Sequence, residues 1–219
     1  RPGPVLIDVP IDIQTNKIEE FVYPEKAEIT GYKPCTEGHT KQIERAVELI
    51  KTASRPIICA GGGVLTSGSK LKLVEFATKT GIPVVSTMMG IGVMPTENKL
   101  YLGMLGSHGK GVANRAIHEA DVILICGARV GDRAVAAPGQ LSANSKIIHI
   151  DIDPAEIGKI TSATIPLVGD AKKVLGEMLP LIKPLETKEW NQEIRAHKEQ
   201  RIEEHPENAI SPKLVIRKL

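Results

Sequence analysis

The stretch PIICAGGG, residues 56–63, decides the fold of this chain, and VILICGAR at residues 122–129 repeats its pattern. In each, a run of five apolar residues of strand length ends in a loop that contains glycine. Similar apolar runs occur at 82–85, 146–150 and 163–168. Short strands that are apolar throughout are typical of a parallel sheet buried on both faces.

Amphipathic helical patterns separate these runs. In residues 39–53, Ile43, Ala46, Val47 and Ile50 recur at i, i+3, i+4 and i+7, which places them on one helix face. Further helical patterns cover 70–80, which Gly81 closes, then 112–120 and 174–182. The alternation predicts an α/β fold, a doubly wound, Rossmann-like parallel sheet of about six strands.

The two ends of the chain do not follow this alternation of strands and helices. RPGPVLIDVP at residues 1–10 resembles a strand that lacks its sheet, and Ser211 before Pro212 resembles an N-cap with proline at the first helical position. We therefore expect the middle part of a longer enzyme. The expected segments are 1–10, the end of a preceding domain; 11–38, a linker; 39–185, the α/β domain; and 186–219, connecting helices whose charges around Trp190 face solvent.

Composition excludes several classes of protein. The 28 lysine and arginine residues against 26 acidic ones give a formal net charge of +2, and aromatic residues make up 3%. We predict no nucleic-acid partner, and no membrane partner because no apolar run has the length of a span. Cys35, Cys59 and Cys126 have no metal-ligand spacing and no signal peptide precedes them, which favours a cytoplasmic protein with Cys59 and Cys126 buried.

The chemistry is expected in the loops that follow the strands. In an open parallel sheet these loops converge at one edge, where ligands bind. Each loop here is rich in glycine or carries charged or small residues. The candidates are Gly61, Gly62 and Gly63; Thr87, Met88 and Met89; Gly127, Ala128, Arg129 and Arg133; Asp151 and Ile152; and Asp170 and Ala171.

Two interpretations remain open for most of these residues. The triple glycine either lets backbone amides approach an anion or forms a tight turn. Arg129 and Arg133 either bind a diphosphate or form surface ion pairs. The dinucleotide fingerprint of NAD domains fails, because Thr66 stands where its third glycine belongs and no acid follows the second strand.

The acidic residues and His108 also have alternatives. Asp151 is suited to accept ribose hydroxyls, whereas Asp153 before Pro154 and Glu156 fits a helix N-cap. Asp170 fits either an N-cap or a ligand contact. His108 in LGSHG either contacts a ligand or belongs to a turn, and no partner for a catalytic triad is evident. His118 and His149 are expected to be packed or surface histidines.

Taken in order, these segments resemble a known family. RPGPVLIDVPIDIQ, AGGG, STMMGIG, YLGMLGSHG, GARVGDR, HIDIDPAEIGK and VGDAKK together resemble the catalytic subunits of acetolactate synthases, which are thiamine-diphosphate enzymes. The resemblance covers essentially the whole chain. It implies that residues 1–10 end the pyrimidine-binding domain, that a complete middle domain follows, and that the last residues lead to the diphosphate-binding domain.

The resemblance also implies a cofactor for the middle domain. In the family this domain binds FAD in an extended pose, largely as a structural cofactor. Two departures are Val130, where relatives often have phenylalanine, and Gly131, where they often have an acid. Carried over by position, the FAD-binding residues are Arg1, Gly61, Gly62, Gly63, Thr87, Met88, Met89, Leu105, Gly106, Ser107, His108, Gly127, Ala128, Arg129, Arg133, Asp151, Ile152, Asp170 and Ala171.

The intact enzymes of the family join pyruvate, after loss of CO2, to a second 2-oxoacid on thiamine diphosphate held by Mg²⁺. They need an activating glutamate and a GDG-type segment, and we find neither in this chain, so we expect residues 1–219 to be inactive alone. Expected partners are a second catalytic subunit, in a dimer or tetramer, and a regulatory small subunit. Two alternatives are the middle domain of another thiamine-diphosphate decarboxylase or oxidase, and a free-standing NAD-binding module.

Overall fold

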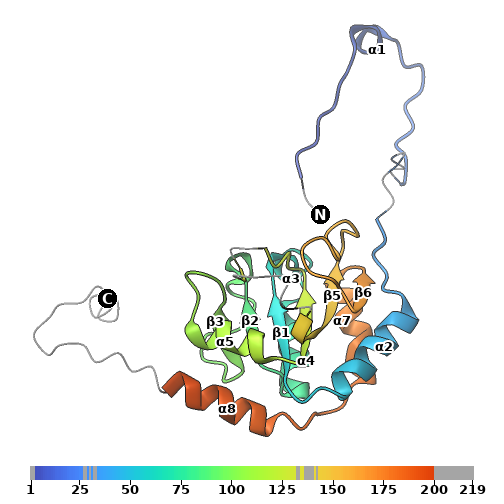
Figure 1. The fold of residues 1–219 in the computed structure, drawn as a ribbon. Coiled ribbons are helices and arrows are strands. Elements are labelled where there is room, and N and C mark those ends of the chain that lie inside the picture. The colour runs from blue at the N-terminus through green and yellow to red at the C-terminus, as the bar shows by residue number, and fades with distance from the viewer. Residues whose placement is uncertain are drawn as a thin grey trace, which may run out of the picture.

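A computed structural model describes residues 3–26, 29, 31, 34–131, 134–135, 141 and 143–199 (Figure 1). Three predictions fall on residues outside this set. They concern Arg1, Arg133 and the helix start at Ser211.

Six parallel strands form the centre of the fold. Their order across the sheet is β3-β2-β1-β4-β5-β6, and every neighbouring pair is parallel. The predicted doubly wound α/β fold is therefore confirmed. The strands are β1 (Pro56–Ala60), β2 (Val84–Ser86), β3 (Tyr101–Met104), β4 (Val122–Cys126), β5 (Lys146–Asp151) and β6 (Ile165–Val168).

Helices cover both faces of this sheet. Apolar side chains of α2, α4 and α7 pack on one face, and those of α5 and α8 pack on the other. The described helices are α1 (Ile11–Thr15), α2 (Thr40–Lys51), α3 (Gly62–Thr66), α4 (Lys70–Thr80), α5 (Gly111–Glu119), α7 (Ala171–Leu181) and α8 (Lys188–Glu199), with a short 3-10 turn, η1 (Met88–Gly90).

The core consists of two apolar clusters separated by the sheet. Alternate residues of one strand enter opposite clusters: Ile58 and Ala60 of β1 lie in one, and Ile57 and Cys59 in the other. Burial on both faces explains why β1 and β4 are apolar at every position. Cys59 and Cys126 are buried as expected, and burial raises the pKa of each thiol to about 12, so neither is a nucleophile at neutral pH.

Two elements differ from the sequence-based prediction. Strand β3 was not assigned from sequence; it contains Gly103 at a φ of 96°, and its pairing with β2 shifts register between Val84 and Val85. Helix α8 was expected to be exposed, yet Trp190 and Ile194 are buried against the sheet cluster that also contains α5. The Trp190 indole donates a hydrogen bond to the Pro56 carbonyl at 3.1 Å, which fixes α8 beside the start of β1.

The N-terminal residues are exposed. Residues 3–10 form no strand, and the large apolar side chains from Val5 to Tyr23 lie in water along the arm drawn in blue in Figure 1. The expected linker contains one short helix, α1, none of whose residues is buried. Within the described residues, no helix combines the length and the apolar character needed to cross a membrane.

Candidate functional site

The loops after the strands lie along one edge of the sheet, which we call the carboxyl rim: residues 61–63, 87–89, 105–108, 127–129, 151–152 and 170–171. Hydrogen bonds that continue the sheet establish this arrangement. The first residue after a strand donates to the end of its neighbour: Gly61 N to Cys126 O (2.9 Å), Thr87 N to Ala60 O (3.0 Å), Leu105 N to Ser86 O (2.9 Å), Gly127 N to Ile150 O (2.8 Å) and Gly169 N to Asp151 O (2.9 Å). In Figure 1 this rim and α3 are at the top of the domain, and α8 is at the opposite end.

The strand order reverses direction between β1 and β4, at the centre of the rim. From β1 the chain first builds outward to β2 and β3, and then returns to the other side of β1 for β4. Loops that diverge on either side of such a point leave a crevice beyond the strand ends, which is where dinucleotides bind in doubly wound sheets. In this structure the loops at this switch point, 61–63 and 127–129, are in contact, and the Gly63 amide donates a hydrogen bond to the Gly127 carbonyl at 3.0 Å.

The three glycines of the β1 loop have different roles. A Cβ on Gly61 would lie 2.2 Å from the Gly127 carbonyl oxygen, and one on Gly63 would lie 2.7 Å from the Gly127 Cα. These two glycines are therefore required by the close approach of two protein backbones. Gly62 is different, because its Cβ would meet only the Met89 side chain and carbonyl, at 3.1 and 3.2 Å.

The β2 loop places apolar side chains next to Gly62. Met88 and Met89 of η1 are about 70% exposed, at 69% and 71%. Gly90 closes the turn, since a Cβ there would lie 2.3 Å from the Ala60 carbonyl oxygen. These two exposed methionines give the rim an apolar surface of the kind that a flat ring system covers.

The β3 loop is held by a residue that the sequence analysis missed. Asn114 of α5 accepts a hydrogen bond from the Gly106 amide at 2.7 Å and donates one to the Gly106 carbonyl at 2.9 Å. Leu105 and Gly106 are buried, whereas Ser107 and His108 are exposed. The available signal was an amide side chain eight residues after Gly106, but only the fold shows that it turns back onto that loop.

His149 holds the β4 loop in place through a hydrogen bond to its backbone. This buried side chain of β5 lies with its Nε2 3.0 Å from the Ala128 carbonyl oxygen. Burial lowers the pKa of His149, so the ring is neutral at pH 7 and Nε2 donates the hydrogen bond. Val130, which follows in the same loop, has a φ of 48° and is also buried, so this segment carries backbone strain.

Arg129 is the exposed cation of the rim. Its side chain is 61% exposed, and its Nε lies 3.9 Å from Oε1 of the buried Glu156. Lys159 shares the same carboxylate oxygen at 3.6 Å. The long distance and the exposure make this ion pair weak, so the guanidinium is available to an anion at the rim.

The acidic residues divide as follows. Asp170 is the N-cap of α7, since its Oδ1 accepts from the amides of Lys172 and Lys173. Asp153 accepts from the Ala155 amide, but a turn rather than the expected helix follows it. Asp151 ends β5 on the rim, and its Oδ1 accepts from the Asp153 amide, which leaves Oδ2 without a hydrogen-bond partner among the described residues.

Two open surface hollows lie away from the switch point between β1 and β4. One is lined by α2 and the start of β5 and β6, at the opposite edge of the sheet, between solvated lysine and glutamate side chains. The other lies beside the first turn of α7 and includes Asp170. The convergence of the strand ends, rather than these hollows, locates the candidate site.

Comparison with known proteins agrees with this geometry. The family model for the thiamine pyrophosphate enzyme central domain matches residues 43–178. The chain belongs to this central-domain family. The matched range extends from α2 to α7 and contains all six strands of the sheet.

Three relatives compared with this chain are named as acetolactate synthase large subunits. This central domain is 48% identical to a probable acetolactate synthase large subunit of Methanocaldococcus jannaschii over 86% of the chain and 32% of that protein. It is 40% identical to the acetolactate synthase isozyme 3 large subunit of Escherichia coli, and 39% to the acetolactate synthase large subunit of Corynebacterium glutamicum, over the whole chain and 40% and 36% of those proteins. The chain thus spans about a third to two fifths of the relatives that it matches.

Proposed function

We propose that this chain is the FAD-binding central domain of an acetolactate synthase large subunit. The observation that carries the proposal is the gathering of the glycine-containing, methionine and arginine loops at the carboxyl rim, around the switch point between β1 and β4. The names of the relatives support the enzyme, and the convergence of the loops at the rim supports an extended dinucleotide there.

The residues present fit such a ligand. The amide of Gly62 donates a hydrogen bond to no described residue, so we propose that it binds a diphosphate oxygen. We propose that Arg129 pairs with the diphosphate, because a guanidinium forms two parallel hydrogen bonds to phosphate oxygens. The free Oδ2 of Asp151 suits a ribose hydroxyl, and the exposed surface of Met88 and Met89 suits the flavin ring.

The remaining rim residues complete the proposed site. Thr87, Leu105, Gly106, Ser107, His108, Gly127, Ala128, Ile152 and Ala171 would contact FAD mainly through backbone and shape, and Arg1 and Arg133, outside the described residues, would add cations. The role of FAD here is to order these loops. Asp170 would act through the α7 N-cap, which holds Ala171 at the rim.

For the intact protein we propose the acetolactate synthase reaction. Two pyruvates, or pyruvate and 2-oxobutanoate, would give a 2-acetohydroxyacid and CO2 in branched-chain amino-acid biosynthesis. Bound thiamine diphosphate with Mg²⁺ supplies the electron sink for the decarboxylation. We propose that residues 1–219 alone lack this site, that the intact protein is a cytoplasmic dimer or tetramer, and that a regulatory small subunit binds it.

Calorimetric titration of residues 1–219 with FAD and with NAD tests the cofactor proposal. We expect one FAD per chain and weaker binding of NAD. Arg129→Ala should lower FAD affinity by about 10- to 100-fold, since a charged hydrogen bond contributes about 1.5–3 kcal/mol. Arg45→Ala is the matched control: Arg45 is exposed on α2, away from the rim, and bonds only to Gln42 among the described residues.

Tighter binding of NAD would favour a free-standing NAD-binding module. Absence of any FAD binding would favour the scaffold domain of another thiamine-diphosphate enzyme. Equal losses in Arg129→Ala and Arg45→Ala would mean that the arginine acts only through overall charge.

A further inference from the structure

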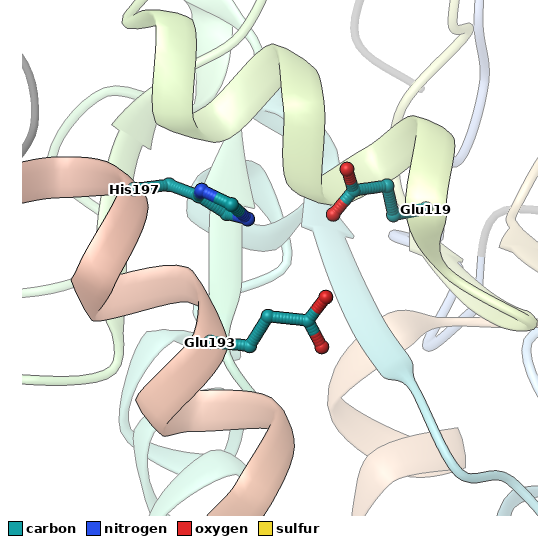
Figure 2. A group of neighbouring side chains, drawn as sticks. All are labelled: Glu119, Glu193 and His197. Carbon is teal, nitrogen blue, oxygen red and sulfur yellow. The ribbon is translucent and has the colours of Figure 1, made fainter.

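A second cluster of ionisable side chains lies far from the carboxyl rim. Glu119 is the last residue of α5, and Glu193 and His197 are four residues apart on α8. Four residues is just over one helical turn, so both α8 side chains lie on the same face. Figure 2 shows the three side chains directed into the same space between the two helices.

The three residues are close enough to share one ion. One ligand atom from each, a carboxylate oxygen or an imidazole nitrogen, lies within 4.8 Å of the other two. Ligand atoms in a tetrahedral zinc site are about 3.4 Å apart, given metal–ligand bonds of about 2.0–2.1 Å. Small side-chain rotations would therefore bring all three into coordination distance.

The hydrogen bonding of this cluster is incomplete. Both ring nitrogens of His197 and Oε2 of Glu119 are shielded from solvent and have no partner in the part of the chain that the structure describes. Buried polar atoms nearly always have a partner, whether protein, water or an ion. An imidazole with neither nitrogen satisfied points independently to a missing ligand between α5 and α8.

Two arginines pair with the carboxylates of the cluster and leave Oε2 of Glu119 and the ring nitrogens of His197 without a partner among the described residues. Arg115 donates to Oε1 of Glu119 at 2.6 Å, which leaves Oε2 directed at the cluster. Arg55 bonds to both oxygens of Glu193 at 3.1 and 3.2 Å and stacks over Trp190, but it is 45% exposed. An exposed ion pair of this kind is weak, so a metal ion can replace the Arg55 guanidinium at one carboxylate oxygen of Glu193.

We propose that Glu119, Glu193 and His197 form a zinc site that ties α8 to α5. One imidazole nitrogen and two carboxylate oxygens are ligands that suit Zn²⁺, and the fourth position would hold water. The site lies at the end of the sheet opposite the rim, beside the start of β1, so it is distinct from the proposed dinucleotide site. Its role is structural: it holds α8 against the domain.

Titration of residues 1–219 with Co²⁺, followed by its visible absorption, and competition with Zn²⁺ test this proposal. The exposed Cys35 is replaced by serine in all variants, so that a free thiol does not bind the metal. We expect one site per chain. His197→Gln and Glu119→Gln should each weaken binding at least about tenfold, whereas His118→Gln and Glu189→Gln, exposed residues on the same two helices, should leave it unchanged.

A structural readout accompanies the titration. Zinc should slow amide hydrogen exchange in α8 of the Cys35→Ser chain and not in the His197→Gln variant, with far-UV circular dichroism confirming that both are folded. Absence of stoichiometric Co²⁺ or Zn²⁺ binding overturns the proposal. Equal affinity across all four variants, or equal loss in the control variants, does so as well, because the metal would then be bound elsewhere.

Discussion

Gly61 and Gly62 differ in the space around them although they are neighbours. Gly61→Ala forces a Cβ within 2.2 Å of the Gly127 carbonyl oxygen, so we expect the free energy of unfolding to fall by about 3 kcal/mol. A Cβ at Gly62 meets only Met89, at 3.1 Å from its side chain and 3.2 Å from its carbonyl oxygen, and a small shift of this exposed turn relieves both contacts, so we expect Gly62→Ala to cost less than about 1 kcal/mol. Urea unfolding measures both, and equal effects would contradict the assignment of Gly61 to protein packing.

His149 makes stability depend on pH. Its pKa is lowered by burial in the folded state, so the unfolded chain binds more protons below the ordinary histidine pKa of about 6.5. The free energy of unfolding should therefore decrease as the pH falls from 7 to 5. Urea unfolding at these pH values should show a smaller decrease in His149→Gln and an unchanged one in the exposed control His118→Gln; the same slope in all three proteins would be inconsistent with a buried neutral His149.

For several single residues the sequence allowed two interpretations, and only the fold could decide between them. Asp170 had an N-cap interpretation that its bonds to Lys172 and Lys173 confirm. Asp153 has the right neighbours for a cap, but no helix follows it. The packing of Gly61 against Gly127 joins loops 66 residues apart in the chain, and no local pattern encodes that contact.

Among the elements, α7 depends on its cap. Asp170→Ala removes the acceptor for two amides of its first turn, so we expect a loss of about 1 kcal/mol in the free energy of unfolding, measured by thermal or urea denaturation. Asp170→Asn should retain most of the stability, because asparagine caps equally well. If Asp170→Ala is as stable as the unmodified chain, the cap does not contribute to stability. If Asp170→Asn keeps its stability but binds FAD more weakly, the carboxylate also contacts the ligand.

Most elements could be predicted because their patterns are local. β1 and β4 are confirmed at their predicted bounds, and so is α4, because apolar runs and a C-terminal glycine mark them. β3 was missed because Gly103 and a register shift interrupt its pattern. The burial of α8 was missed because, among the side chains described from 188 to 197, only Trp190 and Ile194 are buried, and charged residues surround them in the sequence.

For the whole molecule, the gathering of the loops at the carboxyl rim could be predicted from the sequence. The side chains that hold these loops in place could not. Parallel strands place their carboxyl ends together, so the gathering of the loops followed from strand type alone. Asn114, His149 and Glu156 hold those loops from a helix, a neighbouring strand and a distant turn. Their roles depend on tertiary contacts, which no spacing in the sequence reveals.

The central claim is that the rim loops form one dinucleotide site at the carboxyl end of the sheet. Hydrogen exchange of residues 1–219 with and without FAD, followed by mass spectrometry at peptide resolution, tests it most directly. We predict slower exchange in loops 61–63, 87–89, 105–108, 127–129 and 151–152, with no change in α8. Protection confined to α8 and the starts of the strands, or no protection at saturating FAD, would contradict the account.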